Sequence, residues 1–328
     1  MLKLTLYKKS DFKAFKKYIA AAFHKKYILG DQRYFNWQYK NSLYLLKANS
    51  PDRSGEIVGH FGFRDLQYKI GKRTKKVRVL INLFVLEKFR AFGFGVMLIK
   101  KVLGKKNPCL VAGYRLPAMK AFKHYKENWQ EGILNRYLAF PREIGWEESI
   151  KIKSLKVIQR PEEINRWWGR ARQMFSATIE RNYDYLAWRF LKNPFLRYQI
   201  LGAKQNGKLG GILIWRQDGE GRYKMGRIVD FVADKKSAAP LLLAFLAELK
   251  KKRISLGEFL FSGDFYKKEL KAAGFFNAVG TKFESYPVLL NPVSFKRHNI
   301  NIAYTFGIDF ENCYFTKAEG DQDRANPH

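Results

Sequence analysis

The sequence predicts a mixed α/β (α+β) fold made of two similar units, each a mixed, mostly antiparallel sheet flanked by helices. Three observations predict it. Strand-like and helix-like segments alternate along the chain, several segments of the first half recur in the second, and 328 residues are enough for two hydrophobic cores. We expect the first unit to span residues 1–150 and the second to span residues 151–328.

The elements of the first half follow in the order strand, helix, strands, helix, strand and helix. Alternating apolar residues in "LKLTLY" indicate the first strand, and apolar residues at helical spacing after Ser10, the expected N-cap, indicate a helix at 10–23. A glycine turn leads into the second helix, which is expected to end at Gly104. The expected strands are 2–7, 42–49, 55–70, 77–86 and 108–114, and the last helix is 116–129.

Three segments of the first half recur in the second half at a nearly constant offset. They place Trp37 opposite Trp188 and Gly59 opposite Gly211. The matched segments are 34–41 with 185–193, 56–64 with 208–216, and 83–85 with 230–232. The segment 155–175 before the second copy is expected to hold a strand and then a helix that starts at Pro161. Each half is therefore interpreted as one copy of the same unit.

The charge of the chain is strongly basic, with 62 Lys and Arg against 29 Asp and Glu, a net charge of +33. Such an excess favours an acidic partner: a polyanionic glycan, an anionic membrane surface or an RNA such as tRNA. A lysine-rich solvated surface is the alternative. No apolar run is long enough for a transmembrane segment, no signal peptide is recognisable, and two cysteines are too few for a disulfide scaffold. The expected location is cytoplasmic.

The stretch "FRAFGFGVMLIKKVLG" at 89–104 carries the main chemical signal, an R-x-x-G-x-G pattern formed by Arg90, Gly93 and Gly95. A strand that feeds a glycine turn and then a helix forms an anion site, because backbone amides and the helix dipole point at the ligand. The pattern is neither a Walker A loop nor a dinucleotide fingerprint, since it follows a central strand and a lysine-rich region comes after it.

These residues resemble motif A of the GNAT-type N-acetyltransferases, in which a strand Val is followed by Q/R-x-x-G-x-G/A at a helix start. Val85, Arg90, Gly93 and Gly95 take the matching positions. The next strand and helix resemble motif B, with Tyr125 in the place of its helix Tyr. The usual Gly-Phe pair is replaced by Asn128 and Trp129, which departs from that motif. The two-unit arrangement is similar to double-GNAT proteins linked to surface-polysaccharide and peptidoglycan assembly, including FemAB-like aminoacyl transferases.

The resemblance implies an acyl-CoA co-substrate, acetyl-CoA or another, and direct attack of an amine on the thioester. Tyr125 would protonate the leaving thiolate, and a backbone amide near Val85 would polarise the carbonyl. The base is open between Asn82, which would have to hold a water, and His60 on the neighbouring strand. The cofactor-binding residues implied by the resemblance are Phe84, Val85, Arg90, Ala91, Phe92, Gly93, Phe94 and Gly95. No metal is expected, since the five histidines form no metal-ligand spacing.

The second copy lacks the glycines. Continuing the alignment from Val232 places Pro240 opposite Gly93 and Leu242 opposite Gly95. Aligning Gly274 and Phe275 with Asn128 and Trp129 places Lys271 where the first copy has Tyr125. We therefore expect the second unit to keep the fold, to lose the cofactor site and to wall an acceptor cleft. Asp264 is a candidate for that cleft. The acidic tail at 319–326 is a weaker candidate, with a disordered chain end as its alternative. Because the second copy does without the glycines, we expect a ligand, a pyrophosphate, to explain them in the first.

The leading interpretation is an N-acyltransferase that moves an acyl group from CoA to an amine of a small molecule or a surface-polymer or glycan precursor. A FemAB-like enzyme that uses aminoacyl-tRNA is the first alternative, and it would give the positive charge a direct purpose. The second alternative is a non-catalytic protein that binds an anionic partner on the same scaffold.

Overall fold

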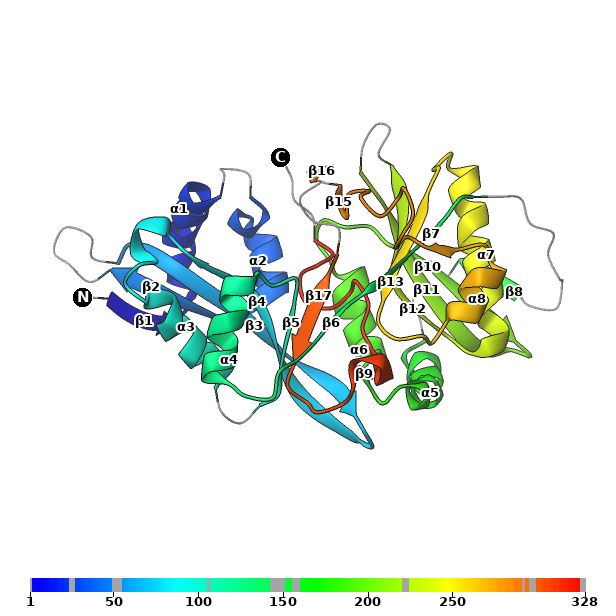
Figure 1. Cartoon of the computed structure of the whole chain (residues 1–328), viewed down its shortest axis with the longest axis horizontal. Helices are drawn as coiled ribbons and strands as arrows, with labels where there is room; N and C mark the ends of the chain where they lie inside the picture. Colours follow the sequence, from blue (N-terminus) through cyan, green and yellow to red (C-terminus); the bar gives the residue numbers. More distant parts are fainter. Residues whose placement is uncertain are drawn as a thin grey trace.

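The structure is a computed structural model, and it shows two twisted sheets side by side with helices on their faces (Figure 1). It describes residues 2–23, 27–48, 55–104, 107–141, 151–154, 160–219, 224–290, 293–294 and 299–324. The mixed α/β class with two mostly antiparallel sheets is confirmed.

The first sheet has the main order β1-β2-β3-β4-β5-β17-β6, and every pair along it is antiparallel except β4–β5. A short strand, β9 (Ala177–Ile179), extends it by pairing with the end of β3, and β18 (Cys313–Tyr314) pairs with β9. The strands of the main order are β1 (Leu2–Leu6), β2 (Leu43–Ala48), β3 (Ile57–Ile70), β4 (Arg73–Val85), β5 (Cys109–Ala112), β17 (Asn301–Tyr304) and β6 (Gln130–Ile133).

The second sheet has the order β8-β10-β11-β12-β13-β7-β14; of the pairs between these described strands, β12–β13 is parallel and the others are antiparallel. Its strands are β8 (Lys151–Ser154), β10 (Gln199–Gln205), β11 (Lys208–Asp218), β12 (Met225–Ala233), β13 (Gly257–Phe261), β7 (Asn135–Ala139) and β14 (Phe276–Asn277). A separate two-stranded ribbon joins β15 (Leu289–Leu290) to β16 (Val293–Ser294).

The two sheets exchange one strand each. Read from β1 and from β8, they have the same sequence of parallel and antiparallel pairs, so β17 in the first sheet corresponds to β7 in the second. Yet β17 comes from the end of the chain, and β7 comes before residue 150. The division into 1–150 and 151–328 stays a prediction, and it does not follow the boundary between the sheets.

Helices cover both faces of each sheet. In the first half, α3 (Phe94–Leu103) and α4 (Leu116–Tyr125) pack on one face, and α1 (Phe12–Ala22) and α2 (Gln32–Tyr39) pack on the other. Alternation along β4 serves both cores, because Val79 and Ile81 face one and Leu80 faces the other. The second half has α5 (Pro161–Ala171), α6 (Tyr183–Leu186) continued by a π-helix at Ala187–Leu191, α7 (Lys235–Lys251) and α8 (Lys267–Ala272).

Several predicted boundaries need correction. Ser10 is not the cap of the first helix, because a 3-10 turn at Lys9–Asp11 comes first and Asp11 stands at the N-cap. The helix expected to reach residue 129 ends at Tyr125, because Lys126 is extended. The helix start at Pro161 is confirmed, whereas the strand expected before it falls on 155–159, outside the described residues.

The two repeated tryptophans meet between the halves. The Trp37 indole donates to the Trp188 carbonyl at 2.8 Å, and the Trp188 indole donates to the Trp37 carbonyl at 3.2 Å. Their rings stack with centroids 5.5 Å apart. Gly59 and Gly211 also have matching surroundings, since an added Cβ would lie 3.4 Å from Leu98 of α3 in one case and 2.8 Å from Leu241 of α7 in the other. Residues matched by the repeat therefore occupy similar packing positions in the two halves.

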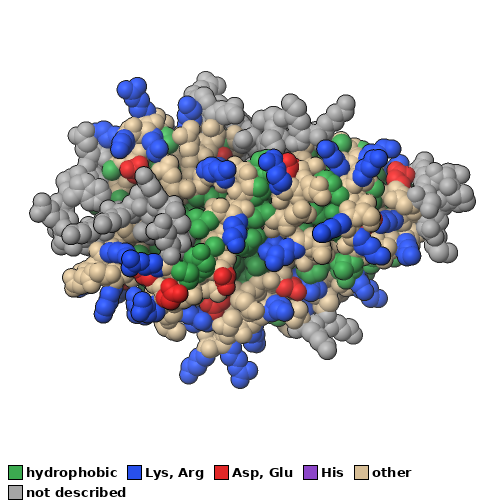
Figure 2. All heavy atoms as spheres, turned by 180° about the vertical axis from the view of Figure 1, so that it is seen from behind, with side chains coloured by type: hydrophobic (Ala, Val, Ile, Leu, Met, Phe, Trp, Pro, Cys, Tyr) green, Lys and Arg blue, Asp and Glu red, His purple; other side chains and the backbone are tan. Residues whose placement is uncertain are grey.

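Lys and Arg side chains are spread over the face drawn in Figure 2, across both halves, and do not gather in one patch. Among the described residues, no helix is long and apolar enough to cross a membrane.

Candidate functional site

A large cavity opens where β4 and β5 part. The two strands pair only from Arg78–Cys109 to Leu80–Val111, although β4 continues to Val85. The cavity has a volume of about 1060 Å³ and is bounded by β4, the start of α3, the end of β5 and the first turns of α4. Residues of the second half close its far side. A volume at the upper end of the usual range for small-molecule sites leaves room for two reactants.

The glycine turn forms one end of this cavity. Gly93, the N-cap of α3, has φ +70°, a conformation that favours glycine, and no side chain caps the helix. Gly93 and Gly95 both line the cavity. Within the described residues, the backbone amides of Phe94 and Gly95 have no acceptor, as expected for the first turn of an uncapped helix.

Glycine stands at positions 93 and 95 for different physical reasons. Gly93 is required by its positive φ, whatever binds there, so the expectation that a ligand alone explains both glycines is too simple. Gly95 has no such constraint. A Cβ at Gly95 would make only an ordinary contact, 3.8 Å from Val85, and would fill the cavity side of the helix start. The helix start at Gly95 is therefore open on its cavity side, with free amides of the kind that bind an anionic group such as a pyrophosphate.

The predicted cofactor residues divide into two groups. Phe84, Val85 and Arg90 line the cavity with the glycines. The Arg90 side chain folds back, with its Nε donating to the Val85 carbonyl at 2.9 Å and its guanidinium 5.2 Å from the Phe84 ring. Ala91, Phe92 and Phe94 are not among the lining residues, and Phe92 is 68% exposed and stacked on Phe94.

Asn82 lies in the cavity at a bulge of β4. The bulge lies between the Phe61–Leu83 and Gly62–Ile81 pairs and leaves Asn82 out of the ladder, with φ +51°. The Asn82 amide donates to the Tyr39 hydroxyl at 2.9 Å and accepts from Arg324 at 3.1 Å. Its side chain is therefore held by two partners at the wall of the cavity.

His60, the other candidate base, is fully buried and is not among the residues that line the cavity. Its Nδ1 is 2.9 Å from the Tyr18 hydroxyl, and its Nε2 has no partner among the described residues. Burial lowers the pKa of His60 to about 3, which keeps the ring neutral. These surroundings favour a packing role over proton transfer with a substrate.

Tyr125 and Asp264 are not brought to the cavity. Tyr125 ends α4 and packs at the edge of the core under α3 and α4, one turn beyond the lining residues Ala121 and Phe122. Asp264 lies on the surface and pairs with Lys267 at 2.6 Å. Their roles stay predictions without support from this geometry.

The C-terminal segment brings side chains to the cavity that the sequence offered only as a weaker candidate, in the tail 319–326, or did not offer at all, as at Lys317. Residues 313–319 are buried, so the tail does not begin as a disordered end. The cavity-lining residues of this segment are Lys317, Asp321, Gln322 and Arg324. Asp321 is 8% exposed and accepts from Arg324 at 2.6 Å and from Gln322 at 3.2 Å. From the second sheet, β11 adds Arg216 and Asp218.

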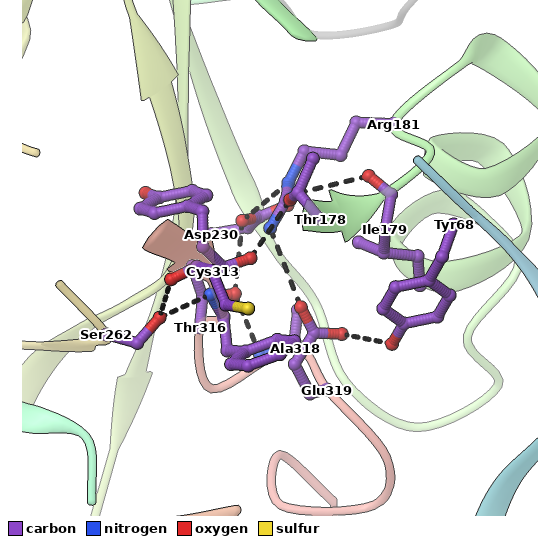
Figure 3. A network of polar contacts seen from close by, with 12 residues as sticks. Tyr68, Thr178, Ile179, Arg181, Asp230, Ser262, Cys313, Thr316, Ala318 and Glu319 are labelled. Carbon is purple, nitrogen blue, oxygen red and sulfur yellow. Dashed lines mark hydrogen bonds and ion pairs between the residues drawn. The ribbon is translucent and has the colours of Figure 1, made fainter. Parts of the chain in front are cut away.

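A buried polar network fixes this segment between the halves (Figure 3). Thr316 donates to Asp230 of β12 at 3.1 Å, and Tyr68 of β3 donates to Glu319 at 3.0 Å. Arg181 lies between the two carboxylates, 2.8 Å from Asp230 and 3.8 Å from Glu319. Burial raises the pKa of Glu319 to about 7, because the attraction of Arg181, which Asp230 shares, only partly offsets the cost of a buried charge.

The equivalent gap in the second sheet is filled. β12 and β13 pair only from Gly226–Gly257 to Ile228–Phe259, and side chains occupy the space beyond. The Tyr266 hydroxyl bonds to both the amide and the carbonyl of Ala233, at 3.1 and 3.2 Å, and the Tyr314 hydroxyl donates to the Phe231 carbonyl.

The helix of the second copy also starts differently. α7 follows β12 after one residue, Asp234, whose carboxylate caps the helix by accepting from the Ser237 amide at 2.8 Å. A carboxylate there opposes a second anion. The alignment of Pro240 with Gly93 is wrong, because Pro240 lies inside α7 and the second copy has no turn of the same length.

Among the residues that the structure describes, no group of three or more His, Cys, Asp or Glu side chains is arranged to hold a metal ion.

No protein-family model matches the sequence, and no curated protein matches it either. Solved structures are similar. They include a GCN5-related N-acetyltransferase from Anabaena variabilis, with TM-score 0.66, 10% identity, and coverage of 94% of this chain and 73% of that one. A conserved protein of unknown function from Enterococcus faecalis, described as a probable N-acyltransferase, has TM-score 0.62, 13% identity, and coverage of 95% and 73%. N-myristoyltransferase from Saccharomyces cerevisiae with bound myristoyl-CoA has TM-score 0.58, 9% identity, and coverage of 94% and 84%. Over most of its length, the chain therefore has the fold of the GCN5-related N-acetyltransferases.

Proposed function

We propose that the protein is an N-acyltransferase that takes an acyl group from acyl-CoA and passes it to an amine. The observation that carries the proposal is the uncapped start of α3, where two free amides and the open side of Gly95 face a cavity large enough for donor and acceptor together. The fold of known acyltransferases supports the assignment.

A bound acyl-CoA supplies an activated thioester carbonyl. The amides of Phe94 and Gly95 bind an anionic pyrophosphate, and the α3 dipole adds to that attraction. The bulge at Asn82 interrupts the β3–β4 ladder for one residue at the cavity wall, and pairing with β3 resumes at Leu83.

We propose that the amine nitrogen bonds to the thioester carbonyl carbon while the C–S bond breaks, that the Asp321 carboxylate takes the amine proton, and that the CoA thiolate leaves and regains a proton from Asp321 or from water. Asp321 is chosen because it is a cavity-lining acid next to the bulge, where Arg324 hydrogen-bonds to both Asp321 and Asn82. The site needs no metal in this scheme. Asn82 and His60 were the bases expected from the sequence, and Asp321 replaces them in the proposal.

We infer that the chain is two copies of one unit and that the second has lost its donor site. The shared order of the sheets and the Trp37–Trp188 pair support the duplication. The Asp234 cap on α7 and the tyrosines in the β12–β13 gap support the loss. The second unit then contributes one wall of the acceptor site.

The acceptor is proposed to be a small molecule or a precursor of a surface polymer or glycan, and an acyl-CoA donor fits the cytoplasmic location expected from the sequence. The positive charge keeps aminoacyl-tRNA in the test as a rival donor, and an anionic polymer or membrane surface as a further partner. The spread of basic residues over the face in Figure 2 gives none of these a defined patch there.

Calorimetry with acetyl-CoA, CoA and tRNA tests the proposal, using the wild type and Gly95→Val. The wild type is expected to bind acetyl-CoA, and Gly95→Val to weaken binding at least tenfold while its melting temperature stays within a few degrees. Salt-sensitive tRNA binding without acetyl-CoA binding would instead support the aminoacyl-tRNA alternative.

Asp321→Asn separates binding from chemistry. It is expected to leave acetyl-CoA affinity unchanged and to slow thiol release with an accepted amine by a factor of about 10²–10⁴. An unchanged rate would remove Asp321 from the proposed mechanism.

A further inference from the structure

The polar end of the cavity holds one cation, Lys317, that no acid among the described residues neutralises. Lys317 lines the cavity and is 1% exposed. Among the described residues it has no carboxylate within ion-pair distance. Within the described residues its one hydrogen bond, to the Val288 carbonyl, is long at 3.4 Å, and that carbonyl already accepts from Arg227 at 2.5 Å. An ammonium buried with so little compensation costs several kcal/mol.

The other cations at this end are neutralised by acids. Arg216 lies 2.7 Å from Asp323 and 2.9 Å from Asp218. Arg324 pairs with Asp321 at 2.6 Å. Lys317 lies in the same segment as Asp321 and Arg324. Within this one segment, therefore, Arg324 has an acidic partner and Lys317 has none among the described residues.

The position of Lys317 is fixed by its neighbours and leaves it little freedom to reach solvent. Thr316 bonds to Asp230, and the Ala318 carbonyl accepts from Arg189 at 3.2 Å. Glu319 is held by Tyr68. The buried network of Figure 3 therefore holds the backbone on both sides of a charge that has no counterion in the part of the chain that the structure describes. A fold that keeps such a charge at a cavity wall provides a site for an anion from outside the chain.

We propose that Lys317 binds a carboxylate of the acceptor, so that the substrate is an amino acid or another amine with a free acid group. This rests on the proposed function. One unneutralised charge matches a monoanion better than a phosphate monoester, which carries nearly two charges at pH 7. The amine end lies toward Asp321 and the Asn82 bulge, and the acid end lies toward Lys317. The acid thus anchors the acceptor while the amine faces the donor.

The test uses pairs of probe acceptors that differ only in charge. The L-amino acids and the ω-amino acids from glycine to 6-aminohexanoate are compared with their carboxamides, with acetyl-CoA as donor and thiol release as the readout. O-phosphoethanolamine is the phosphate arm. The wild type is expected to prefer the acid of at least one pair. Lys317→Met is expected to raise KM for that acid by roughly 30-fold or more and to abolish the preference, whereas Lys317→Arg retains most of it. Lys267→Met, a surface lysine paired with Asp264, is the matched control and is expected to behave like the wild type.

The melting temperature of Lys317→Met distinguishes a binding role of Lys317 from a structural role. If Lys317 serves an external anion, Lys317→Met removes a poorly compensated buried charge, and its melting temperature equals or exceeds that of the wild type. A clear drop in melting temperature would show that Lys317 supports the fold. No wild-type preference for any acid over its amide, or a preference for O-phosphoethanolamine, overturns the inference. A further result is a Lys317→Met enzyme that keeps its preference for the acid while the fall of its rate toward low pH disappears. That result would give Lys317 a role in proton transfer and would overturn the inference. Calorimetry with acetyl-CoA separates these results from a failure of the proposed function, since that failure appears as loss of donor binding.

Discussion

Gly93 and Gly95 belong to one motif but are constrained in different ways. Gly93 satisfies a backbone conformation, and Gly95 keeps a space open. The motif in the sequence located both residues but could not separate them, because an R-x-x-G-x-G pattern carries no dihedral angle. The same limit applied to His60, whose place on a strand was evident but whose distance from the cavity depended on which face of the sheet it occupies.

Alanine at the two glycines is expected to change stability in opposite directions. Gly93→Ala forces a Cβ into the left-handed region and should lower the unfolding free energy by about 1 kcal/mol. Gly95→Ala meets no close neighbour within the first turn of a helix and should raise it by up to about 1 kcal/mol. Urea denaturation of both variants measures this. A loss of stability in both would mean that packing, not open space on the cavity side, explains Gly95.

His60 is expected to stay neutral in the folded protein down to about pH 4. Its folded-state pKa of about 3 lies below the unfolded value of about 6.5, so only the unfolded chain gains a proton between them. The contribution of His60 to stability is therefore present above pH 6.5 and is lost as the pH falls toward 3. An NMR titration of the imidazole follows the protonation directly. Titration near pH 6.5 would reinstate His60 as a candidate base.

The C-terminal segment 313–324 is the element on which the site depends, although it has almost no regular secondary structure. It joins β9 through β18, it bridges to Phe261 of β13, and it places Lys317 and Asp321 at the cavity. The sequence could not predict this course. A short apolar run followed by acids is equally typical of a frayed end, and its partners Tyr68, Arg181 and Asp230 lie far away in the chain.

Strands and helices with regular patterns were more predictable. Alternation located β1, helical spacing located α1, and Pro161 located the start of α5. Some errors lie at ends, as at Ser10 and after Tyr125, where tertiary contacts and local backbone angles decide the boundary. Another is a whole element, since α2 was not expected.

Glu319 is expected to make the segment sensitive to pH. Its folded-state pKa of about 7 lies above the unfolded value near 4.5, so the folded protein holds a proton that the unfolded chain releases. The stabilisation is complete below pH 4.5 and is lost as the pH rises to about 7, by up to about 3 kcal/mol. In Glu319→Gln this loss should vanish. The difference in unfolding free energy between the two proteins at each pH isolates Glu319 from His60, whose effect has the opposite sign. A difference that does not change between pH 4.5 and 7.5 would contradict this.

In the whole molecule, the repeat was visible in the sequence, whereas the exchange of strands between the two sheets was not. The matched tryptophans and glycines indicated two related halves, and the sheets have matching orders. The exchange of β7 and β17 was not predictable, because the pattern of a buried strand is the same whichever sheet it joins. As a result, each sheet needs a strand from the other half of the sequence, and the cavity takes its walls from both.

Residues 1–150 alone are therefore not expected to form a stable unit. Without β17, the first sheet loses the strand between β5 and β6, and both strands expose unpaired backbone groups. The fragment also lacks the Trp188 partner of Trp37 and the cavity residues from 317–324. We expect it to show no cooperative thermal transition by circular dichroism and no acetyl-CoA binding by calorimetry, in contrast to the full chain.

Co-expression with residues 151–328 supplies β17 and receives β7, so the pair is expected to co-purify and to regain the transition. A fragment 1–150 that melts cooperatively and binds acetyl-CoA by itself would show that the exchanged strand is dispensable and that the boundary at residue 150 separates two independent domains.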